Sequence, residues 1–310
     1  MDTNTLQAFL AVAGTGSFSL AAEQLFLTQP AVSKRIATLE EELAARLFER
    51  LGKKVLLTEA GRTLLPKARH ILQEMDEGRR LIADLSSEIS GVLQLATSHH
   101  IGLHRLPNIL RDFSLRYPLV EFDLSFLDSE TGCEAVAAGD LELAVVTLPQ
   151  AATAKLLLHK VWDDPLMIMV SKEHPLAGMH DSFTALARYP AILTESGTVT
   201  RRLIDRRFES LGVSLKIGVE TNYLESIRML VSTGLGWSVL PLSMLHSELV
   251  CIELPGVQFH RELGMVTHSK RSLSRATQAF CNMLLTIAGE CNTNRQTLLS
   301  SKCLAREKNP

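Results

Sequence analysis

The sequence lacks the features that would place the chain in a membrane or an oxidising compartment. None of its apolar runs reaches the roughly 20 residues that a membrane-spanning helix needs. The first residues, MDTNTLQAFLAVAG, carry no basic segment ahead of an apolar run, so we identify no secretion signal. The five cysteines are scattered, and none belongs to a Cys-x-x-Cys pair. This usage fits a reducing cytoplasm.

The chain also lacks a strong charge of either sign. Its formal net charge is −2 over 310 residues, with 46% hydrophobic and 21% charged residues. That composition is typical of a globular protein, and the length is sufficient for two or three domains with their own cores. Because the whole surface does not attract nucleic acid, any DNA binding must depend on local clusters of cations.

One such cluster lies in SFSLAAEQLFLTQPAVSKRI, residues 17–36, which predicts two short helices joined by a tight turn. We expect Ser19 to cap the first helix, with Phe26 and Leu27 closing its apolar face, and Thr28 to cap the second, with Pro30 in its first turn. The inward-facing positions of the second helix are Ala31, Val32, Ile36 and Leu39. Its outer face carries Thr28, Gln29, Ser33, Lys34 and Arg35, which are side-chain types that reach base edges and phosphates. Taken alone, this segment could be an ordinary pair of packed helices.

A basic hairpin follows and favours DNA. Leu47–Glu49 and Val55–Leu57 predict two short strands, with Gly52 in the turn between them. Arg50, Lys53 and Lys54 lie at or near the tip of this hairpin, where they could contact phosphates beside a DNA groove. Outside such a context, a hairpin with lysines at its tip is usually just a solvated turn. The complete predicted set of DNA-contacting residues is Ser17, Ser19, Thr28, Gln29, Pro30, Ser33, Lys34, Arg35, Arg50, Lys53 and Lys54.

A long helical pattern begins after Thr58 and ends at Ser90 and Gly91. Its apolar seam has alternating spacings of four and three residues and comprises Leu64, Ala68, Ile71, Met75, Gly78, Ile82, Leu85 and Ile89. Pro66 is expected to kink the early part. The seam could pack on the downstream domain, but we favour pairing with the same helix of a second subunit. Such a homodimer would present two readers to two half-sites of double-stranded promoter DNA.

Beyond Gly91, strands alternate with helices, which predicts an α/β architecture with ligands at the carboxyl ends of the strands. The predicted strands are residues 92–97, 121–126, 141–147, 166–171, 191–194, 236–240, 251–254 and 263–267. The predicted helices are His104–Tyr117, Ser129–Ala138, Val199–Leu211, Tyr223–Ser232 and Ser272–Ala288.

Hydroxyl groups recur at the strand-to-helix junctions, where free backbone N–H groups can bind an anion. The candidate effector-binding residues are Thr97, Ser98, His99, Asp128, Ser129, Thr147, Ser196, Thr198 and Thr200. Singly, each Ser or Thr could be only a helix cap. Together they favour a small anionic ligand, either a carboxylate or an inorganic oxyanion. Glu195 would disfavour an anion if it pointed inward.

Other chemistries find less support. His100 and His104 share a helix face beside His99, but no cysteine or nearby carboxylate completes a metal site, so we assign neither metal nor cofactor. The segment GLGWSV, residues 234–239, lacks the third glycine of a dinucleotide loop. An enzyme on the α/β portion remains an alternative without a recognised catalytic motif. A DNA-binding architectural protein that needs no ligand is the other alternative.

The chain resembles the LysR-type transcriptional regulators. The matching residues are LQAFLAVAGTGSFSLAAEQLFLTQPAVSKRIATLEEELAARLFER, the wing that follows and LTEAGRTLLPKARHIL, and the resemblance extends over about residues 1–290. It implies an α+β multidomain fold with a winged helix-turn-helix (1–58), a linker helix that forms dimers (59–90) and an α/β effector domain (91–290) like a periplasmic binding protein. It also implies a homotetramer built from two dimers.

The resemblance further divides the effector domain into two subdomains. Chain crossings near Val161–Asp164 and Val266–Ser269 would leave about 91–161 and 268–290 in subdomain 1 and about 162–267 in subdomain 2. In such relatives, effectors are contacted by Ser and Thr side chains and backbone amides at the junctions named above. The polar segment 291–310 extends beyond this core and is expected to be disordered.

Overall fold

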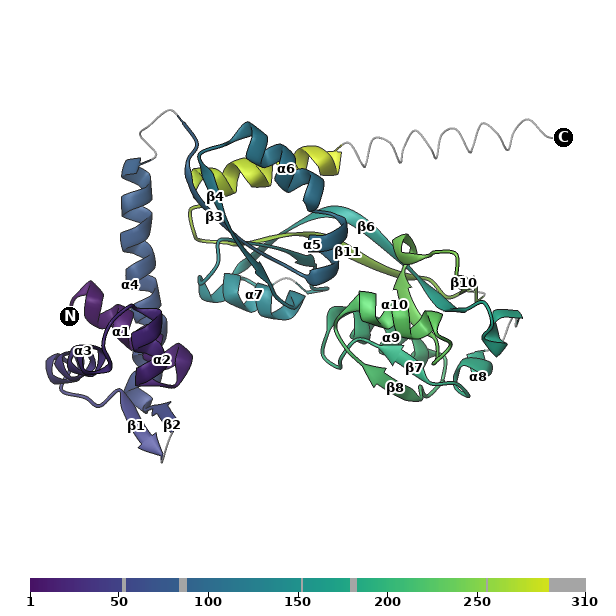
Figure 1. Cartoon of the computed structure of the whole chain (residues 1–310), viewed down its shortest axis with the longest axis horizontal. Helices are drawn as coiled ribbons and strands as arrows, with labels where there is room; N and C mark the ends of the chain where they lie inside the picture. The colour runs from purple at the N-terminus through teal and green to yellow at the C-terminus, as the bar shows by residue number, and fades with distance from the viewer. Residues whose placement is uncertain (52–53, 84–87, 152, 179–182, 255, 290–310) are drawn as a thin grey trace. The chain divides into compact units, whose positions relative to one another are not determined.

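The computed structural model describes residues 1–51, 54–83, 88–151, 153–178, 183–254 and 256–289. The chain forms two units, one built from Met1–Ser87 and the other from almost all of the chain from Glu88 onward. Figure 1 shows both. Each unit is considered separately below.

The N-terminal unit is a winged helix-turn-helix, as the sequence predicts. Its elements are α1 (Thr3–Thr15), α2 (Phe18–Gln24), α3 (Gln29–Glu42), β1 (Phe48–Leu51), β2 (Lys54–Leu57) and α4 (Glu59–Ala83). β1 and β2 pair antiparallel to make the wing. The core contains Phe9, Leu39 and Leu47, whose side chains are fully buried. Val32 and Ile36 of α3 are also buried, which agrees with the inward face expected for this helix.

Two details of the helix-turn-helix differ from expectation. Ser17, and not Ser19, caps α2, because Ser17 has an extended backbone and its hydroxyl accepts a hydrogen bond from the backbone N–H of Leu20. Phe26 does not close an apolar face. The helix ends at Gln24, Phe26 takes a left-handed backbone conformation (φ 54°), and its side chain is 97% exposed.

Helix α4 continues through Pro66, and the Thr58 hydroxyl caps its first turn by accepting from the N–H of Gly61. The early part of its seam is covered within the chain, because Ala68 is fully buried and Leu64 and Ile71 pack on the core of the winged helix-turn-helix. A second subunit is therefore not needed to cover these positions. Met75 is 41% exposed. Leu85 lies outside the described residues, as does the side chain of Ile82.

The C-terminal unit is built on a seven-stranded sheet of order β10-β6-β11-β5-β3-β4, in which β9 also pairs with β6. The strands are β3 (Gly91–Thr97), β4 (Val120–Phe126), β5 (Leu143–Thr147), β6 (Leu156–Ser171), β9 (Ser238–Pro241), β10 (Leu249–Ile252) and β11 (Phe259–His268). β3 is parallel to both β4 and β5, so the carboxyl ends of these three strands lie at one edge. A small parallel sheet joins β7 (Ala191–Leu193) to β8 (Ile217–Glu220).

The helices of this unit are α5 (His99–His104), α6 (Pro107–Arg116), α7 (Ser129–Ala138), α8 (Phe183–Leu186), α9 (Val199–Ser210), α10 (Leu224–Ser232) and a last helix over residues 275–289, with short 3-10 turns at Pro175–Gly178 and Leu242–Met244. Of these, α6 and the last helix pack on one face of β3 and β5, and α7 packs on the other. Phe113 of α6 and Phe280 of the last helix meet at 5.1 Å between ring centroids, and Figure 1 shows these two helices together. The predicted helix His104–Tyr117 is wrong at its start, because Pro107 opens α6 and α5 is a separate helix.

The buried hydrophobic clusters of this unit fall into two groups, which define two subdomains. Subdomain 1 is centred on residues such as Leu95, Phe113 and Phe280, and subdomain 2 on residues such as Phe208 and Trp237. β6 and β11 pair with each other and run through both. The return crossing lies earlier than Val266–Ser269, because Leu263–Thr267 already pair with β5 of subdomain 1.

Candidate effector pocket and DNA-reading surface

A pocket of about 540 Å³ lies where the subdomains meet. Its lining residues are Ser98, His99, His100, Phe126, Leu127, Asp128, Ser129, Glu130, Thr131, Thr147, Thr194, Thr198, Val199, Thr200, Asn222, Tyr223, Leu224 and Arg261. Subdomain 1 contributes the carboxyl ends of its parallel strands and the starts of α5 and α7. Subdomain 2 contributes the starts of α9 and α10. Helix N-termini carry free N–H groups and partial positive charge, so this arrangement favours an anion.

Seven of the nine predicted effector-binding residues line this pocket: Ser98, His99, Asp128, Ser129, Thr147, Thr198 and Thr200. The other two do not. The Thr97 hydroxyl is buried and donates to the carbonyl of Val145 (2.8 Å), which fixes β3 to β5. Ser196 is exposed and lies outside the lining. Glu195 is also outside the lining, but its carboxylate accepts a hydrogen bond from the side-chain amide of Asn222 (3.3 Å), which is part of the lining.

The hydroxyl groups in the lining divide into structural and available ones. Thr198 caps α9 by accepting from the N–H of Arg201 (3.1 Å), and Ser129 accepts from the N–H of Thr147 (3.1 Å). Ser98 occupies the N-cap position of α5, but its side chain makes no capping hydrogen bond within the described part of the chain. A ligand could therefore bind the Ser98 hydroxyl without breaking a bond that the fold uses.

Arg261 of β11 is the buried cation of the pocket, and the sequence analysis missed it. Only 7% of Arg261 is exposed. Its Nε donates to Asp164 Oδ2 (2.7 Å) and its Nη1 donates to the Thr200 hydroxyl (2.9 Å). Asp164 also faces Arg105 at 3.5 Å. Since two guanidinium groups face one buried carboxylate, this cluster retains positive character beside the pocket.

Two carboxylates make hydrogen bonds across the cleft. Asp128 accepts from the side-chain amide of Asn222 (3.1 Å). Glu130 Oε1 accepts from the backbone N–H of Val199, the first residue of α9 (2.5 Å). The pocket thus has acceptors as well as donors, and a protein carboxylate already occupies one helix N-terminus.

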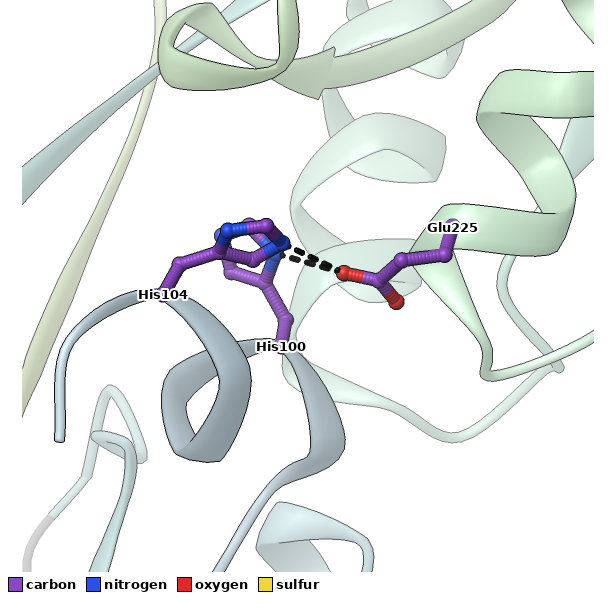
Figure 2. A group of neighbouring side chains, drawn as sticks. All are labelled: His100, His104 and Glu225. Carbon is purple, nitrogen blue, oxygen red and sulfur yellow. Dashed lines mark hydrogen bonds and ion pairs between the residues drawn. The ribbon is translucent and has the colours of Figure 1, made fainter. Parts of the chain in front are cut away.

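A polar cluster of His100, His104 and Glu225 lies at the margin of the pocket (Figure 2). Burial would raise the pKa of Glu225, but hydrogen bonds from His100, from the backbone and from His104 outweigh it and lower that pKa to about 2. Burial lowers the pKa of His100, and its hydrogen bond with Glu225 opposes this shift. Asp164 and Arg261 also act on His100 electrostatically.

The predicted DNA-contacting residues of α3 lie at the surface of the N-terminal unit. Thr28, Gln29, Pro30 and Lys34 are exposed, and Ser33 and Arg35 are partly exposed. The Gln29 side-chain amide donates to the Ser33 hydroxyl (2.9 Å), so the two side chains are held together. Thr28 occupies the N-cap position but makes no side-chain capping bond among the described residues. Gly52 and Lys53 lie outside the described residues, as do the side chains of Arg50 and Lys54.

Comparisons with known proteins agree with this division of the chain. Residues 3–62 match the model of the bacterial regulatory helix-turn-helix proteins of the lysR family. Residues 86–288 match the LysR substrate binding domain. Within the described residues, the structure contains no helix long and apolar enough to cross a membrane.

Individual relatives extend these matches. The transcriptional activator CmpR of Synechocystis is 31% identical over 90% of this chain and 93% of its own length. The fold of CbnR, solved in complex with its target DNA, matches with a TM-score of 0.62 at 20% identity, over 93% of this chain and all of that one. The regulatory domain of Synechocystis CcmR, solved with 2-phosphoglycolate, matches with a TM-score of 0.58 at 25% identity, over 64% of this chain and 98% of that one.

Proposed function

Because the chain belongs to the LysR family of bacterial transcriptional regulators, we propose that its pocket binds a small anionic effector which controls promoter binding. The family is one of DNA-binding regulators with an effector domain, and that general function holds for this chain. The effector class, the residues that bind it and the assembly are the substance of the proposal.

The buried guanidinium of Arg261 carries the proposal. Two of its five N–H donors are used by Asp164 and Thr200, which leaves donors for a ligand. A cation in a partly enclosed pocket is attracted to an anion more strongly than one in bulk water. The Ser98 hydroxyl and the start of α5 add neutral donors in the same lining. The ligand's anionic group is therefore a carboxylate or another oxyanion.

The carboxylates of Asp128 and Glu130 define the rest of the ligand. A second negative charge on the ligand would be repelled by these carboxylates, whereas a hydroxyl group on the ligand would donate a hydrogen bond to them. The pocket volume of about 540 Å³ suits a molecule of metabolite size. We therefore propose a hydroxylated carboxylate or a small phosphate ester rather than a bare inorganic ion.

A ligand held by both subdomains favours the conformation in which they grip it. If that conformation has a different affinity for DNA, binding of the effector changes the affinity for the promoter. The coupling is reciprocal, so promoter DNA changes the affinity for the effector by the same factor. We propose that this happens in a cytoplasmic homodimer joined through α4, with two dimers forming a homotetramer. In each dimer, Gln29 and Ser33 of α3 would face base edges, while Lys34, Arg35 and the wing would face phosphates.

The test begins with native mass spectrometry of the full chain for retained small molecules, followed by calorimetric titration with a panel of hydroxy acids and small hydroxylated phosphate esters. For the ligand that binds, Ser98→Ala should weaken affinity about fivefold to tenfold, the value of one hydrogen bond, with no change in Tm. Thr198→Ala should instead lower stability by about 1 kcal/mol, because Thr198 caps α9.

Ser114→Ala is the matched control, since Ser114 is half-buried on α6 and does not line the pocket. Unchanged affinity in Ser98→Ala would place the ligand elsewhere. A chain that neither retains a molecule nor binds any anion of the panel would contradict the proposed effector class.

A further inference from the structure

We propose that His100, His104 and Glu225 form a binding site for a divalent late transition-metal ion, of which Zn²⁺ fits best. The site joins the two subdomains, because the histidines belong to α5 of subdomain 1 and Glu225 to α10 of subdomain 2. It lies at the margin of the proposed effector pocket, which His100 also lines, and it does not depend on the identity of the effector. The sequence analysis set a metal aside for want of a carboxylate, and the fold supplies one from 121 residues beyond His104.

The three side chains already have the spacing that a metal requires. His100 and His104 are one helical turn apart, so their rings lie on one face of α5, with centroids 4.7 Å apart. Glu225 Oε1 is 3.3 Å from His100 Nδ1 and 2.9 Å from His104 Nε2, and the three ligand atoms lie within 4.8 Å of one another. Figure 2 shows both rings pointing toward that oxygen. With zinc bonds of about 2.0 Å, tetrahedral ligand atoms stand roughly 3.3 Å apart.

The ligand chemistry selects the kind of metal. Two imidazoles and one carboxylate form a set that binds Zn²⁺ and its neighbours, whereas Mg²⁺ and Ca²⁺ prefer oxygen ligands throughout. Three protein ligands leave a fourth position for water or a small ligand. The side chain of His100 is 4% exposed, that of Glu225 24% and that of His104 44%, so the cluster is closed at one end and open to solvent at the other. The ion would enter beside His104.

The cluster is also incompletely satisfied. Glu225 Oε2 and His100 Nε2 are buried and make no hydrogen bond with the described residues. Buried polar atoms without partners cost free energy, so folding stability alone gives no reason for this arrangement. A metal ion bound by both oxygens of Glu225 would satisfy Oε2.

In a second cluster of possible metal ligands, a protein cation already balances the carboxylates. Asp163, His260 and Glu262 also lie within metal-binding distance of one another. There the ammonium of Lys160 lies 2.7 Å from Asp163 and 2.8 Å from Glu262, so a cation is already present. This cluster is more exposed and serves as an internal control.

A bound ion would hold α5 and α10 together, because it would have ligands on both helices. His100 also lines the effector pocket, so fixing α5 to α10 fixes one side of that pocket. Metal and effector would then influence each other's affinity reciprocally.

The experiment uses the full chain carrying Cys291→Ser and Cys303→Ser, which removes the thiols of the tail as competing ligands. After chelation and dialysis, Zn²⁺ is titrated against a chromogenic chelator, and Co²⁺ is added separately as a spectroscopic probe. We expect one Zn²⁺ per chain, a rise in Tm with Zn²⁺ concentration and visible Co²⁺ bands typical of four-coordinate nitrogen and oxygen ligation.

His104→Ala and Glu225→Gln should each weaken Zn²⁺ binding by at least about tenfold, since even the loss of a residue that supports a metal ligand costs that much. Both should abolish the Co²⁺ bands. His260→Ala should leave binding unchanged, and so should Ser98→Ala, which separates this site from the effector site. The proposal is overturned if the parent chain binds no stoichiometric Zn²⁺, if both ligand variants bind it as the parent does, or if His260→Ala weakens it equally.

Discussion

The carboxylate of Glu130 accepts a hydrogen bond from the backbone N–H of Val199, across the cleft between α7 and α9. A side chain of one subdomain thus occupies the positively polarised helix start of the other. An anionic effector that approaches α9 must either displace this carboxylate or share the site with it.

Replacing the charge of Glu130 while keeping its shape should therefore strengthen anion binding. Glu130→Gln retains an acceptor for Val199 but removes the negative charge, so the identified effector should bind about threefold to fivefold more tightly at low salt. Calorimetric titration at two ionic strengths measures this. Glu134→Gln, an exposed carboxylate on the same helix, provides the control. Equal or weaker binding in Glu130→Gln would show that the anion does not approach α9.

The α3 surface predicts two different effects on DNA binding. Gln29→Ala and Ser33→Ala should reduce the preference for the target promoter over unrelated DNA, because these hydrogen-bonded side chains would contact base edges. Lys34→Ala should weaken binding to both DNAs alike and lower the salt slope by about one, as expected for a lost phosphate contact. Fluorescence anisotropy over a range of salt concentrations distinguishes the two. If Lys34→Ala altered only sequence preference, the assignment of roles would be reversed.

Substitutions at two positions of α4 should have different effects, one on the stability of the N-terminal unit and the other on dimer formation. Ile71 packs on the core of the winged helix-turn-helix, so Ile71→Asp should destabilise this unit by on the order of 3 kcal/mol. Met75 is exposed within the chain, so Met75→Asp should leave the fold intact but dissociate the proposed dimer. Circular dichroism with sedimentation velocity measures both quantities. An unchanged oligomer in Met75→Asp would contradict pairing through this part of α4.

The thiols of Cys281, which is buried, and Cys133, which is half-buried, should react slowly in the folded protein. Burial raises the pKa of Cys281 to about 12, and burial together with Glu130 and Glu134 raises that of Cys133 to about 11. In the chain with Cys291→Ser and Cys303→Ser, a thiol reagent at pH 8 should modify Cys281 roughly a thousandfold more slowly than after unfolding. Rapid modification without unfolding would show that this thiol is accessible.

These thiols also predict a pH dependence of stability. The unfolded thiol loses its proton near its ordinary pKa of 9.0, before the folded one does. Their contribution is therefore complete below pH 9 and is lost as the pH rises toward 11 and 12, with a limiting slope of about 1.4 kcal/mol per pH unit for each thiol. Cys281→Ala should reduce this slope in chemical unfolding measured between pH 9 and 11.

Local sequence patterns predicted the helices correctly where the helix and its packing depend on residues that are close together in the sequence. The apolar spacing identified the buried Val32, Ile36 and Leu39 of α3, and α7 has the predicted bounds Ser129–Ala138. The helix expected to begin at His104 begins at Pro107 instead. That proline was an available signal, because proline favours the first turn of a helix.

Residues that depend on distant pairing could not be found in this way. Arg261 reaches Thr200 and Asp164 only because β11 returns beside β6. One local signal existed: Phe259, Arg261 and Leu263 alternate along the strand and are all buried, which places an arginine on an inward face. Glu225 gave no such signal, because its partners His100 and His104 lie on another subdomain and far away in sequence.

The continuous pairing of β6 with β11 has a mechanical consequence. The two strands are hydrogen-bonded from the pair Phe259 and Leu166 at one end to the pair His268 and Leu156 at the other. The register shifts once along this ladder, between Leu263 and Gly264. A Cβ atom at Gly264 would lie only 2.2 Å from the carbonyl oxygen of His159, so the two backbones are pressed together at this place as only glycine allows. Relative motion of the subdomains must therefore bend a two-stranded ribbon instead of swinging on slack loops. A two-stranded ribbon of this kind resists small bends elastically, so a ligand that closed the pocket would have to work against that stiffness.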